Sequence, residues 1–152
     1  MENNINIFSL NSINGYSLNI SFTNGELWCY GGDIYIIEIK DIIGNIIFKC
    51  NIHYDYLMHI LFNRLTELYE YGNPFEENLP ITSTTCTNNI MGYTNEKDNI
   101  VLAFTEYNIM TYRVNKYIEL EFEIDVIHEI LSSGELFELL ESNVWIIKRL
   151  VG

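Results

Sequence analysis

The segment from Ile118 to Asp125 alternates apolar and acidic side chains without interruption. Successive side chains of a β-strand point to opposite faces, so a period of two predicts a strand with one face in the core and the other entirely acidic. The apolar positions are Ile118, Leu120, Phe122 and Ile124, and the acidic positions are Glu119, Glu121, Glu123 and Asp125. Such a chain needs a sheet with one packed side and one solvated side, which antiparallel sheets commonly provide.

The first third of the chain predicts an antiparallel meander of four or five strands. Asn24-Gly25 supplies the two positive-φ residues of a type I′ hairpin turn. Gly31-Gly32 predicts a bulge or a short turn, and residues 43–45 predict a further turn. The alternating segments between these turn residues predict strands at 5–10, 16–22, 27–29, 33–40 and 46–52.

Between residues 54 and 71 the apolar period changes to 3.6, which predicts one long amphipathic helix. Its apolar face consists of Tyr54, Leu57, Met58, Leu61, Leu65 and Leu68. Gly72-Asn73-Pro74 ends it, because a C′ glycine followed by proline stops a helix.

The second half predicts a polar loop at 75–80, an unassigned connection at 87–99, and strands at 81–86, 100–104 and 109–114. Helical spacing resumes at 126–131, and the capping-box spacing of Ser132 and Glu135 restarts a helix through Leu140. The chain is therefore predicted to form one α+β domain over residues 1–152. It has a mostly antiparallel β-sheet, one long inserted amphipathic helix and a helical C-terminal segment.

The charge balance restricts the partners. Eight Lys and Arg stand against 21 Asp and Glu, a formal net charge of -13. This charge repels phosphate backbones and anionic lipids, so we expect neither nucleic acid nor membrane as a partner, whereas a basic protein would be attracted. No secretory signal precedes the first strand, and three cysteines form an odd set, so we expect a cytoplasmic protein.

Catalytic and metal-binding patterns are weak. Cys50, His53 and His59 lie close in sequence, but zinc needs about four converging ligands and no second pair with ligand spacing follows. There is no G-x-S-x-G motif and no phosphate-binding glycine loop, and carboxylates on one exposed strand face share a single solvated environment. The sequence therefore predicts no enzyme, no metal and no cofactor.

The acidic segment has two interpretations. From Tyr117 to Ile147 there is no Lys or Arg. Either Arg113 and Lys116 compensate the carboxylates from a neighbouring strand, or the complement is a cationic surface of another protein. Eleven tyrosines support the second interpretation, because Tyr is enriched at protein interfaces. On that interpretation the partner-binding residues are Glu119, Glu121, Glu123, Asp125, Glu129, Glu135 and Glu138.

The stretch 28–36 (WCYGGDIYI) leads into a strand, turn, strand and helix. In this stretch, and in its length, acidity and mixed fold, the chain resembles immunity proteins of bacterial polymorphic-toxin and contact-dependent-inhibition systems. The resemblance concerns general form and assigns no residue. It implies a stoichiometric inhibitor that binds a cognate toxin, many of which are basic nucleases.

Two other functions stay open. One is a phage-type inhibitor that imitates DNA charge against a restriction or RNA-guided nuclease. The other is a small-ligand-binding module or enzyme with a pocket that contains aromatic residues and Cys50, His53 or His59.

Overall fold

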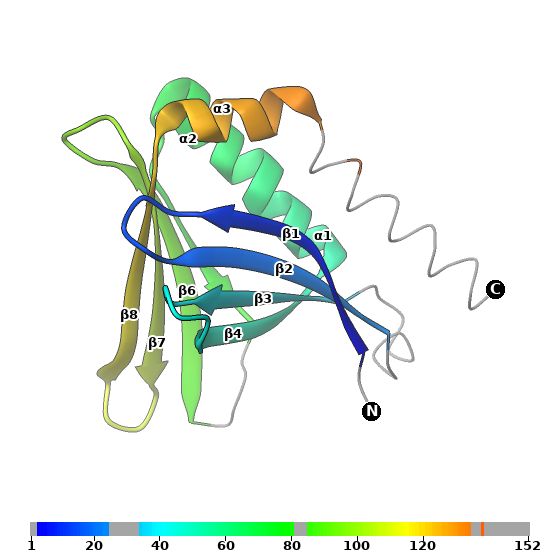
Figure 1. Ribbon diagram of the computed structural model, residues 1–152. Coiled ribbons are helices and arrows are strands. Elements are labelled where there is room, and N and C mark those ends of the chain that lie inside the picture. Colours follow the sequence, from blue (N-terminus) through cyan, green and yellow to red (C-terminus); the bar gives the residue numbers. More distant parts are fainter. Residues whose placement is uncertain (1–2, 25–33, 81–84, 135–137, 139–152) are drawn as a thin grey trace.

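The computed structural model describes residues 3–24, 34–80, 85–134 and 138 (Figure 1). They form two four-stranded antiparallel sheets with helices packed against them, so the chain is α+β. Sheet A consists of β1 (Asn3–Asn11), β2 (Ser17–Asn24), β3 (Ile34–Lys40) and β4 (Ile46–His53). Sheet B consists of β5 (Phe75–Leu79), β6 (Cys86–Thr94), β7 (Ile100–Asn108) and β8 (Arg113–Phe122).

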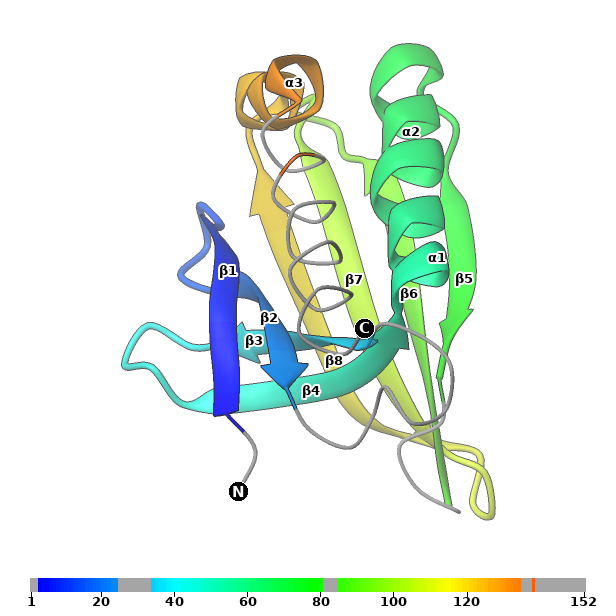
Figure 2. The same cartoon turned by 90° about the vertical axis from the view of Figure 1, so that its right-hand side faces the viewer.

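The order of elements repeats along the chain. Each sheet is a meander in which every strand pairs with its neighbour in sequence. A helical segment follows each meander: α1 (Tyr54–Met58), η2 (His59–Arg64) and α2 (Leu65–Tyr71) after sheet A, and α3 (Ile124–Ser133) after sheet B. The two sheets stand at a steep angle to each other, and the helices lie on the same side of sheet B as sheet A does (Figures 1 and 2).

The predicted meander is confirmed for four strands. Asp41 fixes the turn between β3 and β4, because its Oδ1 accepts hydrogen bonds from the N–H groups of Ile43 (3.1 Å) and Asn45 (2.9 Å). Gly44 takes a φ of 94° in this turn. The hairpin turn at Asn24-Gly25, the strand at 27–29 and the glycine pair at 31–32 involve residues outside the described part. Over residues 17–22, β2 pairs with β1 on one side and with β3 on the other.

The chain is helical from Tyr54 to Tyr71, but not as one regular α-helix. The central segment η2 is a π-helix, and Ile60 lies in the core beside Leu57 and Leu61. The 3.6-residue pattern did not include Ile60. Gly72 ends the segment in the left-handed conformation, with a φ of 70°.

Two predictions for the second half are wrong. Residues 75–79 form strand β5 instead of a polar loop, and they pair with β6 from Phe75 opposite Gly92 to Leu79 opposite Asn88. Residues 109–112 form a turn instead of a strand, because Asn108 Oδ1 accepts hydrogen bonds from the N–H groups of Met110 (2.9 Å) and Thr111 (3.0 Å).

The remaining predictions for this half have mixed outcomes. The unassigned connection at 87–99 contains most of β6 and the turn before β7, and the strand predicted at 100–104 lies within β7. Of the strand predicted at 81–86, residues 81–84 lie outside the described part. The helix predicted at 126–131 lies within α3. The predicted restart at Ser132 is wrong, because Ser132 still belongs to α3, which ends at Ser133 with Gly134 as its C-cap. Beyond Gly134 only Glu138 is described, with its N–H bonded to the carbonyl oxygen of Gly134 at 2.9 Å.

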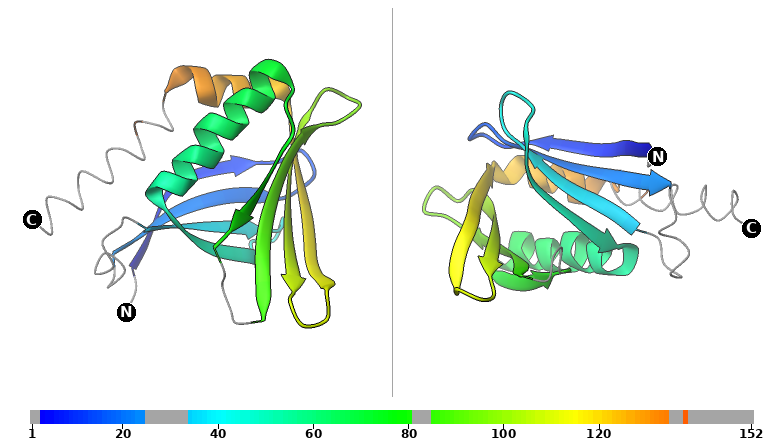
Figure 3. Two further views of the ribbon diagram at one scale, coloured as in Figure 1. Left: turned by 180° about the vertical axis from the view of Figure 1, so that it is seen from behind. Right: turned by 90° about the horizontal axis from the view of Figure 1, so that it is seen from below.

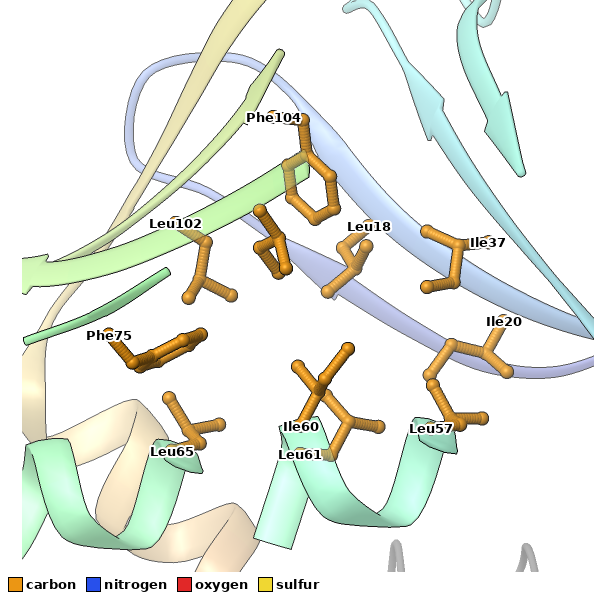
Figure 4. Close-up of a pocket in the computed structure, with 11 residues that line it drawn as sticks. Leu18, Ile20, Ile37, Leu57, Ile60, Leu61, Leu65, Phe75, Leu102 and Phe104 are labelled. Carbon is orange, nitrogen blue, oxygen red and sulfur yellow. The ribbon is translucent and has the colours of Figure 1, made fainter. Parts of the chain in front are cut away.

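The core lies between the sheets and the helical segment that links them. The rings of Phe48 and Phe104 join sheet A to sheet B, with their centroids 5.3 Å apart. A small cavity lies where the two sheets and the helical segment meet, and all eleven residues of its wall are apolar (Figure 4). The volume of the cavity that is open to the centre of a water molecule is about 10 Å³. An apolar cavity of this size holds no water.

Candidate functional site

The predicted acidic residues lead to the outer face of sheet B. On β7, the side chains of Ile100, Leu102 and Phe104 belong to the core, so those of Val101, Ala103 and Thr105 point to the opposite face. Among the described elements, no helix or strand lies over this opposite face (Figures 1 and 3). We call it the outer face.

Strand register places the side chains of the outer face in three rows that cross β7. Directly opposite residues of an antiparallel pair point to the same side, so each row can be followed from strand to strand. The rows are Tyr93, Val101 and Glu121; then Glu76, Met91, Ala103 and Glu119; then Asn78, Asn89, Thr105 and Tyr117. None of these positions holds a Lys or Arg.

The alternation predicted for β8 is confirmed through Phe122. Ile118, Leu120 and Phe122 are buried, whereas Glu119 and Glu121 lie on the outer face. The prediction of four carboxylates in one line is wrong, because the strand ends at Phe122 and Ile124 begins α3. The line on the strand therefore holds two carboxylates, roughly 7 Å apart.

Compensation from a neighbouring strand is not what the structure shows. Arg113 and Lys116 lie on β8 itself, and Lys116 stands opposite Glu106. The residues opposite Glu119 and Glu121 are Ala103 and Val101. The ion pairs of the described residues involve Arg64 and His59 only, with Glu67 and Glu77. Within the described ranges, the acidic row of β8 thus has no cation in ion-pair contact, although the charge of Lys97 is near enough to help lower the pKa of Glu121.

Glu119 is held by two tyrosines. The Tyr117 hydroxyl donates a hydrogen bond of 2.7 Å to its carboxylate, and Tyr93 on β6 also hydrogen-bonds to it. The contact from Tyr93 spans the width of β7, where Ala103 stands opposite Glu119 with its small side chain buried. The bond to Glu119 raises the pKa of Tyr117, and burial followed by the Glu119 charge raises the pKa of Tyr93. Both hydroxyls are neutral donors at physiological pH.

Glu121 has a different environment. The side-chain amides of Asn99 (2.6 Å) and Asn95 donate to its carboxylate, and these bonds lower its pKa. The two carboxylates of the row therefore do not share the single solvated environment that the sequence predicted.

The β1–β2 turn covers the free edge of β8 beside Glu119 and Glu121. The Asn14 amide donates to the carbonyl oxygen of Glu119 at 2.7 Å and accepts from the N–H of Glu121 at 3.1 Å. The N–H of Ile13 adds a bond of 2.9 Å to the carbonyl oxygen of Glu121. The Asn14 side chain thus takes the place of a neighbouring strand and fixes the backbone from which both carboxylates project.

The other predicted binding residues lie beyond the strand. Glu123 is the N-cap of α3 and makes no side-chain capping bond, and Asp125 lies in the first helical turn. Asp125 and Glu129 are exposed, on a helix whose Ile127 is buried in the core. Glu138 is exposed as well, and Glu135 lies outside the described residues.

A second polar cluster lies where η2 meets β5. It could not be predicted from the sequence, because residues 75–80 have the composition of a polar loop. Glu77 Oε1 accepts a hydrogen bond from Arg64 Nε (2.7 Å) and lies 3.3 Å from His59 Nε2. The Tyr56 hydroxyl lies 3.4 Å from Glu77 Oε2 and also donates to the carbonyl oxygen of Asn78. Oε1 takes the contacts from Arg64 and His59, and Tyr56 adds the bond to Asn78, so the cluster joins the helical segment to β5.

This cluster predicts a pH-dependent stability. Burial alone would raise the pKa of Glu77, but the hydrogen bonds from Arg64 and His59 outweigh burial and the pKa is lowered. The ionised form is therefore favoured by folding, so the stabilisation is present above pH 4.5, the ordinary carboxyl value, and is lost as pH falls through the folded pKa. Glu77→Gln should lower the free energy of unfolding by about 1–2 kcal/mol at pH 7, measured by urea denaturation.

Below the folded pKa of Glu77, wild type and Glu77→Gln should become equally stable. Glu70→Gln is the control, since Glu70 is exposed on α2, and it should leave the acid limb of the stability curve unchanged. A Glu77→Gln difference of the same size at pH 7 and pH 3 would contradict the assignment.

The remaining candidate residues do not converge. Cys50 is buried in the core, and burial raises its pKa to about 12, which keeps the thiol protonated. His53 is exposed at the end of β4, and His59 contacts Glu77. Among the described residues, no group of three or more His, Cys, Asp or Glu side chains is arranged to hold a metal ion.

None of the helices in the described part combines the length and the apolar character needed to cross a membrane. No protein-family model, curated protein sequence or solved structure matches this chain.

Proposed function

We propose that this protein is a stoichiometric protein inhibitor of the immunity type, which binds a basic protein through the outer face of sheet B and the acidic start of α3. The observation that carries the proposal is the row of Glu119 and Glu121. Both carboxylates project from an open sheet face, and the residues opposite them are uncharged. A cationic surface on a partner would supply the missing complement.

The neighbouring side chains fit a protein interface. Tyr117 is 53% exposed on the outer face, and Tyr112 is 89% exposed in the turn that follows β7. Tyrosine combines a large apolar surface with a polar tip, and it is enriched at the centres of protein interfaces. The acidic residues at the start of α3, Asp125 and Glu129, extend the negative charge beyond the strand.

The test is the association rate with the protein that the tagged chain captures from its source cell. Glu119→Gln combined with Glu121→Gln removes two charges from the row, and we expect association at low salt to slow by about tenfold. The matched control is Asp55→Asn combined with Glu70→Gln, which changes the net charge equally at exposed positions of α1 and α2. The control should associate within about twofold of wild type.

Further measurements separate inhibition from simple binding. One equivalent of the chain should abolish the activity of the captured protein, and raising the salt concentration should remove most of the difference between wild type and the double variant. Equal association rates for all three proteins would refute the role of the row.

Charge mimicry of DNA has less support, because the row on β8 contains only two carboxylates. They lie roughly 7 Å apart, whereas the phosphates of one DNA strand follow each other at about 3.4 Å along the helix axis. Displacement of the partner by short duplex DNA would favour that function. A thermal shift with a metal ion or nucleotide, and no captured protein, would favour a ligand-binding module or enzyme.

A further inference from the structure

Two polar atoms at the centre of the outer face are buried without a hydrogen-bond partner among the described residues. They are Thr105 Oγ1 and Asn89 Oδ1. Thr105 is 1% exposed and Asn89 is 5% exposed, and the two residues stand directly opposite each other on β7 and β6. A buried polar group normally has a partner, so a pair of orphaned atoms at one place points to a partner that comes from outside the chain.

The orientation of the Asn89 amide is fixed. Its Nδ2 donates a hydrogen bond of 2.6 Å to Glu76 Oε1, so the orphaned atom is the carbonyl oxygen, which can only accept. Thr105 Oγ1 can accept as well. A hydrogen-bond donor is therefore the partner that would satisfy both atoms.

The charge around the two atoms specifies the donor further. Glu76 and Glu119 lie on either side in the adjacent row, and no position of the three rows holds a Lys or Arg. A donor group that carries positive charge is thus favoured over a neutral amide or hydroxyl. Tyr117 stands opposite Thr105 and offers an aromatic ring on which a planar cation can stack.

We infer that Thr105, Asn89 and Glu76 form an acceptor site for the guanidinium group of an arginine side chain presented by the partner. Guanidinium carries five N–H donors in a plane, so it can bond to oxygens on two adjacent strands at once, whereas an ammonium group is a compact point charge. This inference rests on the proposed function and names the chemistry that the partner presents.

Entry to the site requires a side chain to move, since both orphaned atoms are closed off from water. Met91 and Tyr117 flank them on the outer face. Met91 is half-buried and unbranched, and it can change rotamer without disturbing the strands. The site is thus closed in the free protein and opens when the guanidinium group arrives.

The test titrates the isotope-labelled full chain with the blocked tripeptide Gly-Arg-Gly and follows the side-chain resonances of Asn89, Thr105 and Met91 by NMR. The matched peptide contains citrulline, which has nearly the same shape without the charge. We expect saturable shifts at these three residues with the arginine peptide. Binding of the citrulline and lysine peptides should be at least about fivefold weaker.

Thr105→Val separates this role from a structural one. It removes the hydroxyl and keeps the shape, so it should leave the thermal midpoint unchanged or higher, because an unsatisfied buried group is lost. Affinity for the arginine peptide should fall by about fivefold. The control Thr94→Val, at an exposed position of β6, should change neither quantity.

The other outcomes distinguish failure of the acceptor site from failure of the proposed function. Equal binding of the citrulline or lysine peptide would refute the guanidinium assignment, and wild-type affinity in Thr105→Val would refute the site. If the peptides fail to bind while Glu119→Gln/Glu121→Gln still slows association with the captured protein, the acceptor site is wrong and the proposed function stands. If the arginine peptide binds but the double variant associates normally, the acceptor site stands and the row is not the interface.

Discussion

Replacing Phe104 by alanine should lower the free energy of unfolding by about 3–5 kcal/mol, the largest effect we expect from a single substitution in this chain. Phe104 is 1% exposed, and its ring contacts Phe48 across the two sheets. It also lines the apolar cavity, so its removal enlarges a space that the surrounding side chains already fail to fill (Figure 4). Urea denaturation followed by circular dichroism measures the loss.

Since this loss is comparable to the whole stability of a small domain, a milder variant is needed as well. Phe104→Leu keeps most of the volume and should cost clearly less than Phe104→Ala while remaining folded. Tyr112→Ala removes an aromatic ring that is 89% exposed, and it should stay within about 0.5 kcal/mol of wild type. A Phe104→Ala loss below about 1 kcal/mol would show that the sheets do not pack through this ring.

The second large effect is expected at Gly92, where the ring of Phe75 lies on the strand in place of a side chain. A Cβ atom at this position would lie 2.2 Å from Phe75 Cε1 and 2.6 Å from Cζ. Gly92→Ala therefore forces the ring away from the cavity wall that it helps to form, and it should destabilise the fold by about 1–3 kcal/mol. Thermal and urea unfolding would both report the loss.

A double-mutant cycle tests this cause. In a Phe75→Ala background the new Cβ meets no ring, so Gly92→Ala should then cost close to nothing. Gly72→Ala serves for comparison, since a Cβ there meets no atom within 4 Å and any cost comes from the φ of 70° alone. Additive losses from Phe75→Ala and Gly92→Ala would show that the effect comes from the backbone and not from the ring.

Elements that follow from local chemistry were predictable from the sequence. The Asp41 turn depends on a side chain and a glycine within five positions, and the buried side of β8 depends on strict alternation. Both signals lie within a few residues of the structure that they produce. The acidic side of β8 could be predicted from the same alternation.

β5 was missed because its signal comes from distant residues. Two adjacent glutamates gave the segment the composition of a loop, but Glu77 is partnered by Arg64 on the preceding helical segment. The ring of Phe75 packs over Gly92, which lies seventeen positions further along the chain. Neither partner can be recognised before the tertiary arrangement is known.

The end of β8 was misplaced because two periods overlap there. Ile124 continues the alternation of the strand, but Ile124, Ile127 and Leu131 also follow helical spacing. The helix prevails in the structure, which removes Asp125 from the acidic line. The acceptor pair on the outer face had no sequence signal, since Asn89 and Thr105 meet only through the pairing of β6 with β7.

The pairing of every strand with its neighbour in sequence bears on how the chain folds. Each sheet can assemble by the successive formation of hairpins, because every strand pairs with a strand that is adjacent in sequence. The entropic cost of closing long loops is then confined to the docking of the two meanders and the helices. We expect this chain to fold faster than β-sandwiches of similar length, whose Greek-key crossovers join strands far apart in sequence.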